Sequence, residues 1–372
     1  MFQSYESVII RPTRILDRNR LEHYDSGEPV ITRFQGTELL TTSAKAFKAN
    51  DILIARRNVY LKRAGIVFFD GITSGDSIIL RLKEDTQKTI GYSREDLIRY
   101  IPFMLNSEHF WIYANKHADG MNSKRISKDT LLEYEFELPS IDEMRDISDK
   151  LWAAYRLKEA YKKLLVTTDE MVKSQFIEMY YNTHNKQTLE SVCPIMSKGI
   201  TPKYVESSSV LVINQACIHW DGQRLGNIKY HNEEIPVRKR ILESGDVLLN
   251  ATGNGTLGRC CVFICPSDNN TYINDGHVIA LSTDRAVILP EVLNTYLSLN
   301  DTQAEIYRQY VTGSTNQVDI VFSDIKKMKV PVPSMDEQIL FVEVLKQADK
   351  SKFELKQCIE HIDKVIKSLI NG

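Results

Sequence analysis

The chain has 372 residues, of which 42% are hydrophobic and 26% charged, a length and composition typical of two or three globular domains. Its 47 Lys and Arg nearly balance its 49 Asp and Glu, giving a net charge of −2. This excludes the strongly basic class of nucleic-acid-binding proteins, so any DNA contact must come from local patches. No run approaches the ~18 apolar residues of a membrane span.

The N-terminus and the cysteines indicate the cellular compartment. The sequence MFQSYESVIIRPTRI contains no basic segment followed by an apolar stretch, so it does not resemble a secretory signal peptide. The six cysteines lack paired C-x-x-C spacing. We therefore expect a cytoplasmic protein with reduced thiols and without disulfides or a zinc site.

Residues 1–140 combine short strand-like runs with turns. The runs 51–55, 65–69 and 77–82 are apolar, rich in β-branched residues and bounded by Gly, Asn or Asp, as is typical of strands. Residues 94–106 have the apolar spacing of a helix. The segment is therefore predicted to be an α+β domain with a curved sheet.

A helix start follows this domain. Pro139 ends the preceding strand, Ser140 fits the N-cap position, and Glu143 completes an S-x-x-E capping box. Neither Pro nor Gly occurs from residue 141 to residue 181, so one helix of roughly 60 Å is predicted over this range.

Residues 187–372 repeat the same order. Strand-like runs occupy 246–250, 260–264 and 277–281, and residues 290–299 have helical spacing. Pro333, Ser334 and Glu337 then form a second S-x-x-E box before a predicted helix over 335–370. The apolar residues of that helix recur at steps of 4, 3, 4 and 3: Leu355, Ile359, Ile362, Ile366 and Leu369.

The two halves are copies of one unit of about 190 residues. LPSIDEM at 138–144 matches VPSMDEQ at 332–338 with an offset of 194 residues, and NDILI at 50–54 matches GDVLL at 245–249 with an offset of 195. Residues 27–36 also resemble 208–217, and 119–127 resemble 312–320. The order of the matches is the same in both halves, which indicates a duplication.

Helices of this length with a narrow apolar stripe need a partner helix. The other copy, packed antiparallel, is the simplest partner and gives the chain a pseudo-twofold axis like the local symmetry of DNA. The alternative is that each helix lies on its own domain. The predicted division is a first domain at 1–140, a first helix and linker at 141–186, a second domain at 187–333 and a second helix at 334–372.

This organisation resembles the specificity (S) subunit of Type I restriction-modification enzymes. The resemblance is carried by the domain–helix–domain–helix order, by ELPSIDEMRD and VPVPSMDEQ, and by KGITPKY, GDVLLNATGNGTLGR and YVTGSTNQVDI in the second half. It implies an α+β fold with two similar α/β target-recognition domains, separated by two long antiparallel helices that form a coiled-coil rod.

The resemblance also implies a function in a complex. Each domain would read one half of a bipartite sequence in double-stranded DNA, and the helices would set the spacing and dock two modification (methyltransferase) subunits. Restriction-translocase subunits would be further partners. The chain itself would be non-catalytic and carry no cofactor, because S-adenosylmethionine, ATP and Mg²⁺ are expected on the partner subunits.

Catalytic alternatives find little support in the sequence. GNGTLG at 253–258 satisfies the G-x-G-x-x-G pattern of dinucleotide sites, but that pattern requires a helix next, and the following RCCVFIC is strand-like. Walker A and adenine-methyltransferase motifs are absent from the sequence. His109, His117, His184 and His231 lie in polar stretches, where we expect them to be exposed, and His219 and His277 lie in strand-like ones, where histidines are commonly structural.

Polar and basic residues on loops are the candidates for DNA contact, because Arg suits guanine, Asn and Gln suit adenine, and Lys, Ser and Thr suit phosphates. In the first half the candidates are Arg56, Arg57, Lys62, Arg63, Asn122, Lys124 and Arg125. In the second half they are Lys198, Thr201, Lys203, Tyr204, Asn250, Thr252, Asn254, Thr256, Arg259, Ser314, Thr315, Asn316 and Gln317.

Three alternatives remain open at this point. The near-neutral charge permits a two-lobed protein-interaction scaffold without a DNA role, and the Gly-rich loop permits a freestanding enzyme. Within the DNA reading, the chain could serve a methyltransferase-only or Type IIB-like system.

Overall fold

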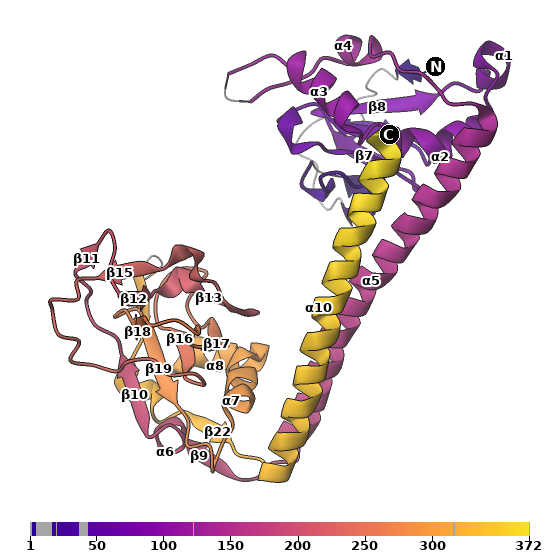
Figure 1. Ribbon diagram of the computed structural model, residues 1–372. Helices are drawn as coiled ribbons and strands as arrows, with labels where there is room; N and C mark the ends of the chain where they lie inside the picture. Colours follow the sequence, from indigo (N-terminus) through magenta and orange to yellow (C-terminus); the bar gives the residue numbers. More distant parts are fainter. Residues whose placement is uncertain are drawn as a thin grey trace. The chain divides into compact units, whose positions relative to one another are not determined.

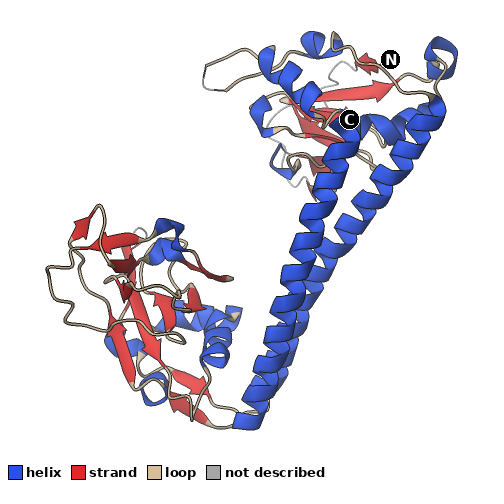
Figure 2. Cartoon of the chain, viewed as in Figure 1, coloured by secondary structure: helices blue, strands red, loops and turns tan. Residues whose placement is uncertain are grey.

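The structure is a computed structural model that describes residues 2–4, 17–19, 21–36, 44–121, 123–314 and 317–371. The chain forms two compact units (Figure 1). The first unit contains Met1–Leu164 and Glu354–Gly372, and the second contains Leu165–Phe353. Both units combine sheets with helices (Figure 2), which confirms the predicted α+β class.

Among the residues that the structure describes, the first unit contains two four-stranded sheets. One has the order β1-β8-β5-β6 and is antiparallel throughout. The other has the order β3-β2-β7-β4, with β2 and β7 parallel. The strands are β1 (Phe2–Ser4), β2 (Asp17–Asn19), β3 (Gln35–Gly36), β4 (Ala44–Phe47), β5 (Ile52–Ala55), β6 (Ala64–Ile66), β7 (Gly71–Ser74) and β8 (Ser77–Leu82). The short helices are η1 (Leu21–His23), η2 (Val59–Leu61), α1 (Thr86–Ile90), α2 (Arg94–Met104), α3 (Glu108–Lys116) and α4 (Lys128–Leu132).

The second unit repeats this arrangement. Its antiparallel sheet has the order β10-β19-β16-β17, and its second sheet has the order β11-β15-β12-β18, with β12 and β18 parallel. These strands are β10 (Ile195–Lys198), β11 (Tyr204–Val205), β12 (Val210–Ile213), β15 (Lys229–His231), β16 (Val247–Asn250), β17 (Cys260–Val262), β18 (Thr271–Asn274) and β19 (Val278–Ser282).

Shorter strand pairs and helices complete the second unit. The pairs are β9 (Lys186–Thr188) with β22 (Lys329–Pro331), β13 (Ile218–His219) with β14 (Gly222–Gln223), and β20 (Val311–Ser314) with β21 (Gln317–Ile320). The helices are α6 (Leu189–Val192), η3 (Gln215–Cys217), η4 (Leu225–Asn227), α7 (Pro290–Ser298), α8 (Asn300–Gln309) and α9 (Phe322–Ile325). The predicted strands and helices of both halves are confirmed within a few residues.

The matching sequences NDILI and GDVLL form the same turn in the two units. Asn50 and Gly245, the residues before the aspartates, both have positive φ angles, of 69° and 96°. Asp51 accepts a hydrogen bond from the backbone N–H of Lys48 at 2.8 Å, and Asp246 accepts one from that of Glu243 at 2.9 Å. Both carboxylates are buried. The duplication inferred from the sequence is therefore present in the hydrogen bonding.

One of the sequence matches is wrong. Residues 208–217 contain β12 and η3, and their topological counterparts are β2 and η1 at residues 17–23, because both strands pair in parallel with the later strand of their sheet. The predicted counterpart at 27–36 contains only the two-residue strand β3. The true counterpart was missed because Asp17–Asn19 is entirely polar and lacks the apolar signature of β12.

The two long helices have the predicted bounds. Helix α5 extends over Ile141–Tyr181 and α10 over Met335–Asn371. Each begins with a complete capping box: the Ser140 backbone N–H donates to Glu143 at 3.1 Å, and the Glu143 N–H donates to the Ser140 hydroxyl at 3.4 Å. The corresponding distances between Ser334 and Glu337 are 2.9 and 3.4 Å.

Within the first unit, the beginning of α5 packs against the end of α10. Leu151 and Tyr155 of α5 form a buried cluster with Ile366 of α10. Lys158, of which only 8% of the side chain is exposed, forms ion pairs with Asp363 at 2.6 Å and with Glu28 at 2.7 Å. The helices are antiparallel here, as predicted.

Within the second unit, the end of α5 packs against the beginning of α10. The Phe176 and Phe341 rings lie 5.1 Å apart, edge to face. Lys352 forms an ion pair with Asp169 at 3.0 Å. Lys352 lies 194 residues after Lys158 and Asp169 lies 194 residues before Asp363, so the two helix-pairing ion pairs are the same contact in two copies.

The alternative in which each helix lies only on its own domain is therefore incorrect, although the first turns do pack there. Met144 is fully buried against the core of the first unit. Gln338, its counterpart 194 residues later, is also buried in the second unit and donates from Nε2 to the carbonyls of Val287 and Pro333.

Three further properties bear on function. Among the described residues, no helix is both long and apolar enough for a membrane span. The same residues include no group of three or more His, Cys, Asp or Glu that could hold a metal ion. The six cysteines are free, and burial raises the pKa of Cys193 and Cys261 to about 12.

Candidate nucleic-acid interface

The predicted loops of the first unit lie side by side. The Ile126 backbone N–H donates to the Arg56 carbonyl at 3.0 Å, and the Asn58 N–H donates to the Lys124 carbonyl at 2.8 Å. The Arg57 guanidinium reaches across to the Ser123 hydroxyl at 3.0 Å. We call the described residues of 56–63 and 119–125 the first loop cluster.

The first loop cluster is strongly basic. It contains six Lys or Arg and one Asp, for a net charge of +5. Lys62, Lys124 and Arg125 are exposed, and within the described part of the chain their side chains have no hydrogen-bond or ion-pair partner. The pKa of nearby Lys45 is lowered, first by burial and then by the positive charge of Arg56. This is an electrostatic environment that attracts anions.

The equivalent loops of the second unit are joined by the same backbone contacts. The Ile320 N–H donates to the Ala251 carbonyl at 2.8 Å, and Thr252 forms an antiparallel bridge with Asp319. The corresponding bridge in the first unit joins Arg57 and Arg125. We call the described residues of 251–259 and 312–320 the second loop cluster.

The second loop cluster is neutral and dense in hydrogen-bonding groups. Its only charged residues are Arg259 and Asp319, and Lys198 contacts both carboxylate oxygens of Asp319 at 2.9 Å. The Thr252 hydroxyl lies 2.9 Å from Nδ1 of His277. Uncharged groups of this kind can hydrogen-bond to base edges as well as to phosphates, and they add no salt-dependent attraction of their own.

The backbone of the two clusters needs left-handed residues at the same places. Gly253 and Gly258 have φ angles of 98° and 84°, and their counterparts in the first unit are Asn58 and Lys62, with φ angles of 55° and 50°. The Gly-rich loop and the sequence ARRNVYLKRAG therefore form one type of loop. The strand β17 follows the Gly-rich loop, as predicted, so the helix of a dinucleotide site is absent there.

Most of the predicted residues are near one of these clusters. Arg63 donates to the Leu21 carbonyl, Thr256 to the Thr252 carbonyl and Arg259 to the Gly255 carbonyl. Thr201, Lys203, Tyr204 and Asn254 are exposed. Burial raises the pKa of Tyr204, and the charge of Asp275 raises it further, which places this tyrosine near the β18–β19 turn.

Some predicted residues need a correction or lie beyond the description. Asn250 is fully buried and donates from Nδ2 to the Gln215 carbonyl at 3.1 Å, so the expectation that it contacts DNA is wrong. It belongs to the buried strand β16 rather than to the loop. Asn122, Thr315 and Asn316 lie outside the described residues, and only the backbone is described at Ser314 and Gln317.

Other residues of the interface were missed. Gln215, His277 and Asp319 contact Thr256, Thr252 and Lys198. His231 was expected to be exposed but is buried, and its Nδ1 accepts from the Lys203 N–H. Asp319 could have been found, because it lies inside the matched segment 312–320, whereas the other contacts join residues too distant in sequence for any local pattern to reveal.

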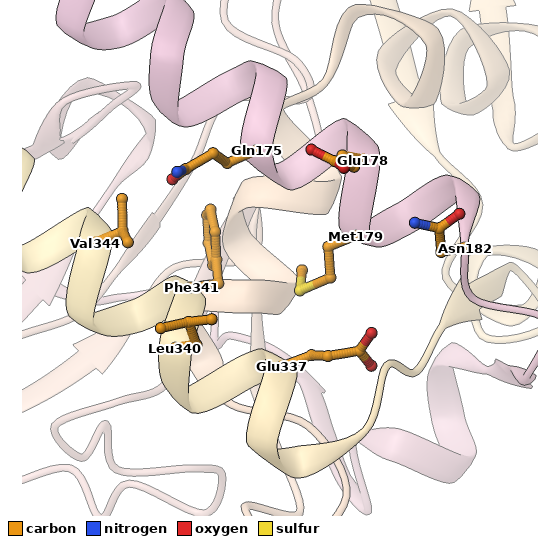
Figure 3. Close-up of a pocket in the computed structure, with 8 residues that line it drawn as sticks. All are labelled: Gln175, Glu178, Met179, Asn182, Glu337, Leu340, Phe341 and Val344. Atoms are coloured by element: carbon orange, nitrogen blue, oxygen red, sulfur yellow. The ribbon is translucent and has the colours of Figure 1, made fainter.

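The helices of the second unit form a separate surface feature. A groove of about 340 Å³ lies between the end of α5 and the first turns of α10 (Figure 3). It is lined by Gln175, Glu178, Met179, Asn182, Glu337, Leu340, Phe341 and Val344. Leu340 is 63% exposed, so an apolar side chain faces solvent beside the capping box.

Comparisons with known proteins agree with this geometry. The chain resembles the S subunit of a Type-I restriction-modification system from M. genitalium, with 13% identity and a TM-score of 0.55 over 100% of this chain and 94% of that one. It also resembles a chain from a structure concerning complex assembly and conformational transition of the type I R-M system, with 14% identity and a TM-score of 0.59 over 99% and 94% of the two chains. At these identities the likeness shows the fold.

The sequence comparisons are more specific. No curated protein matches the chain. Residues 185–363 match the family model of the Type I restriction modification DNA specificity domain. This range includes most of the second unit, the whole second loop cluster and most of α10. Just under half of the chain, residues 185–363, is therefore similar in sequence to the Type I restriction modification DNA specificity domain.

Proposed function

We propose that the chain is the DNA sequence-specificity subunit of a Type I restriction-modification complex, in which each unit reads one half of a bipartite target. The observation that carries this proposal is the duplication of the loop cluster. Two equivalent clusters on one chain, joined by the same backbone contacts but bearing different side chains, suit a DNA target whose two halves differ in sequence.

The long helices set the separation of the half-sites and dock the modification subunits. The pseudo-twofold relation of the ion pairs Lys158–Asp363 and Lys352–Asp169 supports this role, because it gives two modification subunits equivalent surfaces. The chain is non-catalytic in this proposal, and S-adenosylmethionine, ATP and Mg²⁺ bind the modification and restriction subunits.

Methylation-sensitive long-read sequencing tests the proposal. DNA from cells that carry this chain and its modification subunit should show a split, asymmetric methylated sequence that disappears when the chain is deleted. Exchange of residues 187–333 for another such domain should alter one half-site only. Methylation that is unaffected by deletion of the chain would contradict the proposal.

The spacing role has its own experiment. Insertion of a few residues near Tyr161, with a matching insertion in the facing part of α10, should change the number of bases between the half-sites. The half-site sequences should remain as they are. An unchanged spacer would show that the helices do not measure the distance.

The docking role is tested at the groove of the second unit. Leu340→Asp places a charge in the groove and should weaken the capture of the modification subunit by the chain. Phe353→Asp is a matched control, because Phe353 is an exposed apolar residue of the same helix, 61% exposed, that does not line the groove. Equal loss with both variants would count against the groove as the docking surface.

The neutral second loop cluster favours one alternative, a protein-interaction scaffold without a DNA role. A gel shift of the assembled complex separates the two functions, because phosphate contacts make DNA affinity fall steeply with salt. Cleavage of unmodified DNA by cells carrying the complex separates a full restriction system from a methyltransferase-only or Type IIB-like one.

A further inference from the structure

The two loop clusters occupy equivalent places but differ in charge. Arg57 and Arg125 form a backbone bridge in the first unit, and Thr252 and Asp319 form the same bridge in the second. The first cluster has a net charge of +5, and the second has a net charge of zero. The bridge between the loops is shared, and the side chains that it carries set the difference in charge.

The two clusters also differ in how many of their cations are free to bind a phosphate. In the first cluster, Lys62, Lys124 and Arg125 are exposed and, within the described ranges, free of side-chain partners. In the second, Lys198 is bound to Asp319, and the Arg259 guanidinium donates to the Gly255 carbonyl. A phosphate therefore meets three cations without side-chain partners at the first cluster, and at the second a neutralised ion pair and one arginine that is bound to a backbone carbonyl.

The hydrogen-bonding groups show the opposite trend. The second cluster presents Asn254 without a side-chain partner among the described residues, and it fixes Thr252 against His277 and Thr256 against Gln215. Fixed donors and acceptors discriminate between bases because a wrong base leaves them unpaired. Free cations on long side chains supply affinity that is independent of sequence.

We infer that the two loop clusters divide the work of DNA binding, although each unit reads its own half-site: Lys124 and Arg125 of the first cluster supply most of the salt-dependent affinity for phosphates, and the second cluster discriminates between bases with uncharged groups. This inference rests on the proposed function. It assigns Lys124 and Arg125 as phosphate-binding residues and Asn254 as a specificity-determining residue.

The experiment compares three variants of the complete complex on its own methylated sequence. Lys124→Ala/Arg125→Ala removes two free cations, and Asn254→Ala removes one free amide. Lys83→Ala/Lys88→Ala is the charge-matched control. These two lysines are exposed and follow the end of β8, whereas the first cluster contacts Asp76 just before its beginning.

The first readout is the slope of log Kd against log salt. Lys124→Ala/Arg125→Ala should lower its magnitude by about 2, at roughly 0.9 for each lost phosphate contact. Asn254→Ala and the control should leave it unchanged. A slope that falls equally in the control and the cluster variant would overturn the inference, because net charge and not the cluster would then be responsible.

The second readout is the methylated sequence. Asn254→Ala should relax one base of one half-site, with discrimination reduced roughly 5- to 150-fold, whereas Lys124→Ala/Arg125→Ala should leave both half-sites intact. A changed half-site in the Lys124→Ala/Arg125→Ala variant would overturn the inference by showing that these cations read bases. An unchanged methylated sequence in the Asn254→Ala variant would also overturn the inference.

Arg125 and Asp319 occupy equivalent positions in the two clusters, and exchanging their charges gives a further test. Asp319→Arg should raise the magnitude of the salt slope by about 1, and Arg125→Asp should lower it by at least as much. An effect of Asp319→Arg without a reciprocal effect of Arg125→Asp would contradict the division of work. The proposed function itself fails on a different result, the absence of chain-dependent methylation with the unaltered protein.

Discussion

The first and second units form equivalent loop clusters from different residues. Comparing the two shows which features the backbone conformation requires and which belong to the side chains at the surface. Asn58 and Lys62 adopt left-handed angles where the second unit has Gly253 and Gly258. The bridge between the two loops joins two arginines in one unit and a threonine and an aspartate in the other. The frame is therefore fixed by backbone hydrogen bonds, and its surface is free to diverge.

The buried carboxylates beneath these loops diverge in the same way. Asp51 is held by Arg81, which contacts both of its oxygens at 2.6 Å. Asp246 is held by the Ser282 hydroxyl at 2.6 Å and, more loosely, by Arg240 at 3.2 Å. The carboxylate caps the same turn in both units, while its cationic partner comes from a different part of the sequence.

The largest expected effect concerns these carboxylates. Asp51→Ala removes a fully buried carboxylate that accepts two hydrogen bonds from the Arg81 guanidinium, and should reduce the free energy of unfolding of the first unit by about 3–5 kcal/mol. Asp246→Ala should cost the second unit about 1–3 kcal/mol, because Arg240 keeps Glu243 at 3.3 Å. Hydrogen exchange of β5 and β16 in the complete chain measures the two losses, and equal losses would show that the partners are equivalent.

The helix-pairing ion pairs are the next comparison. Lys158→Met removes the buried lysine that Glu28 and Asp363 share and should destabilise the first unit by about 1–3 kcal/mol, since Glu28 keeps Lys162 at 2.9 Å. Lys352→Met should cost at most about 1 kcal/mol, because the Lys352 side chain is 24% exposed against 8% for Lys158. Urea unfolding followed at the helices distinguishes the two. A larger loss with Lys352→Met would reverse the assignment of the buried pair.

Substitutions at the left-handed positions should change the free energy of unfolding by smaller amounts than Asp51→Ala does, with opposite signs in the two units. A Cβ at Gly258 would lie 2.0 Å from Oε1 of Gln303 at a φ of 84°, so Gly258→Ala should cost about 1–3 kcal/mol. Lys62→Gly removes the left-handed penalty and should leave stability unchanged or raise it by up to about 1 kcal/mol. Thermal unfolding checks both, and destabilisation by Lys62→Gly would mean that the lysine side chain packs in a stabilising way.

The capping boxes predict the smallest and most nearly equal effects. Ser140→Ala and Ser334→Ala should each cost about 1 kcal/mol, and the two losses should add because the boxes lie in different units. The double variant measured by urea unfolding checks additivity. Clearly unequal losses of stability in the two single variants would show that one capping box is supported by contacts that the other lacks.

The same boxes predict a dependence on pH. Hydrogen bonds from Ser140 and Ser334 lower the pKa of Glu143 and Glu337 in the folded chain. The boxes therefore stabilise the helices at pH values above the pKa of unfolded glutamate, and the contribution is lost as the pH falls through the lower, folded-state pKa. Glu143→Gln/Glu337→Gln should flatten this part of the stability profile, as measured by unfolding between acidic and neutral pH.

Features that depend on neighbouring residues were predicted well. The bounds of α5 and α10, both capping boxes and the buried strands followed from signals within three or four positions, and the duplication followed from comparing the halves. The burial of Asn250 and His231 could not be predicted from such local signals. A polar residue enters a core only where a distant group satisfies it, and here these groups are the Gln215 carbonyl and the Lys203 N–H. The strand β2 was missed because Asp17–Asn19 is entirely polar and lacks the apolar signature of a strand.

The sequence by itself determined that the chain contains two copies of one α+β unit, each followed by a capped helix. Helix starts and strand periodicity depend on residues close together in the chain, and the repetition is found by comparing the chain with itself. Only the tertiary structure decided which loops meet, which charges remain free and which are neutralised. Lys198 and Asp319 are separated by 121 residues, and Lys158 and Asp363 by 205. Pairings at such separations depend on how the strands and helices pack, which no window of the sequence contains.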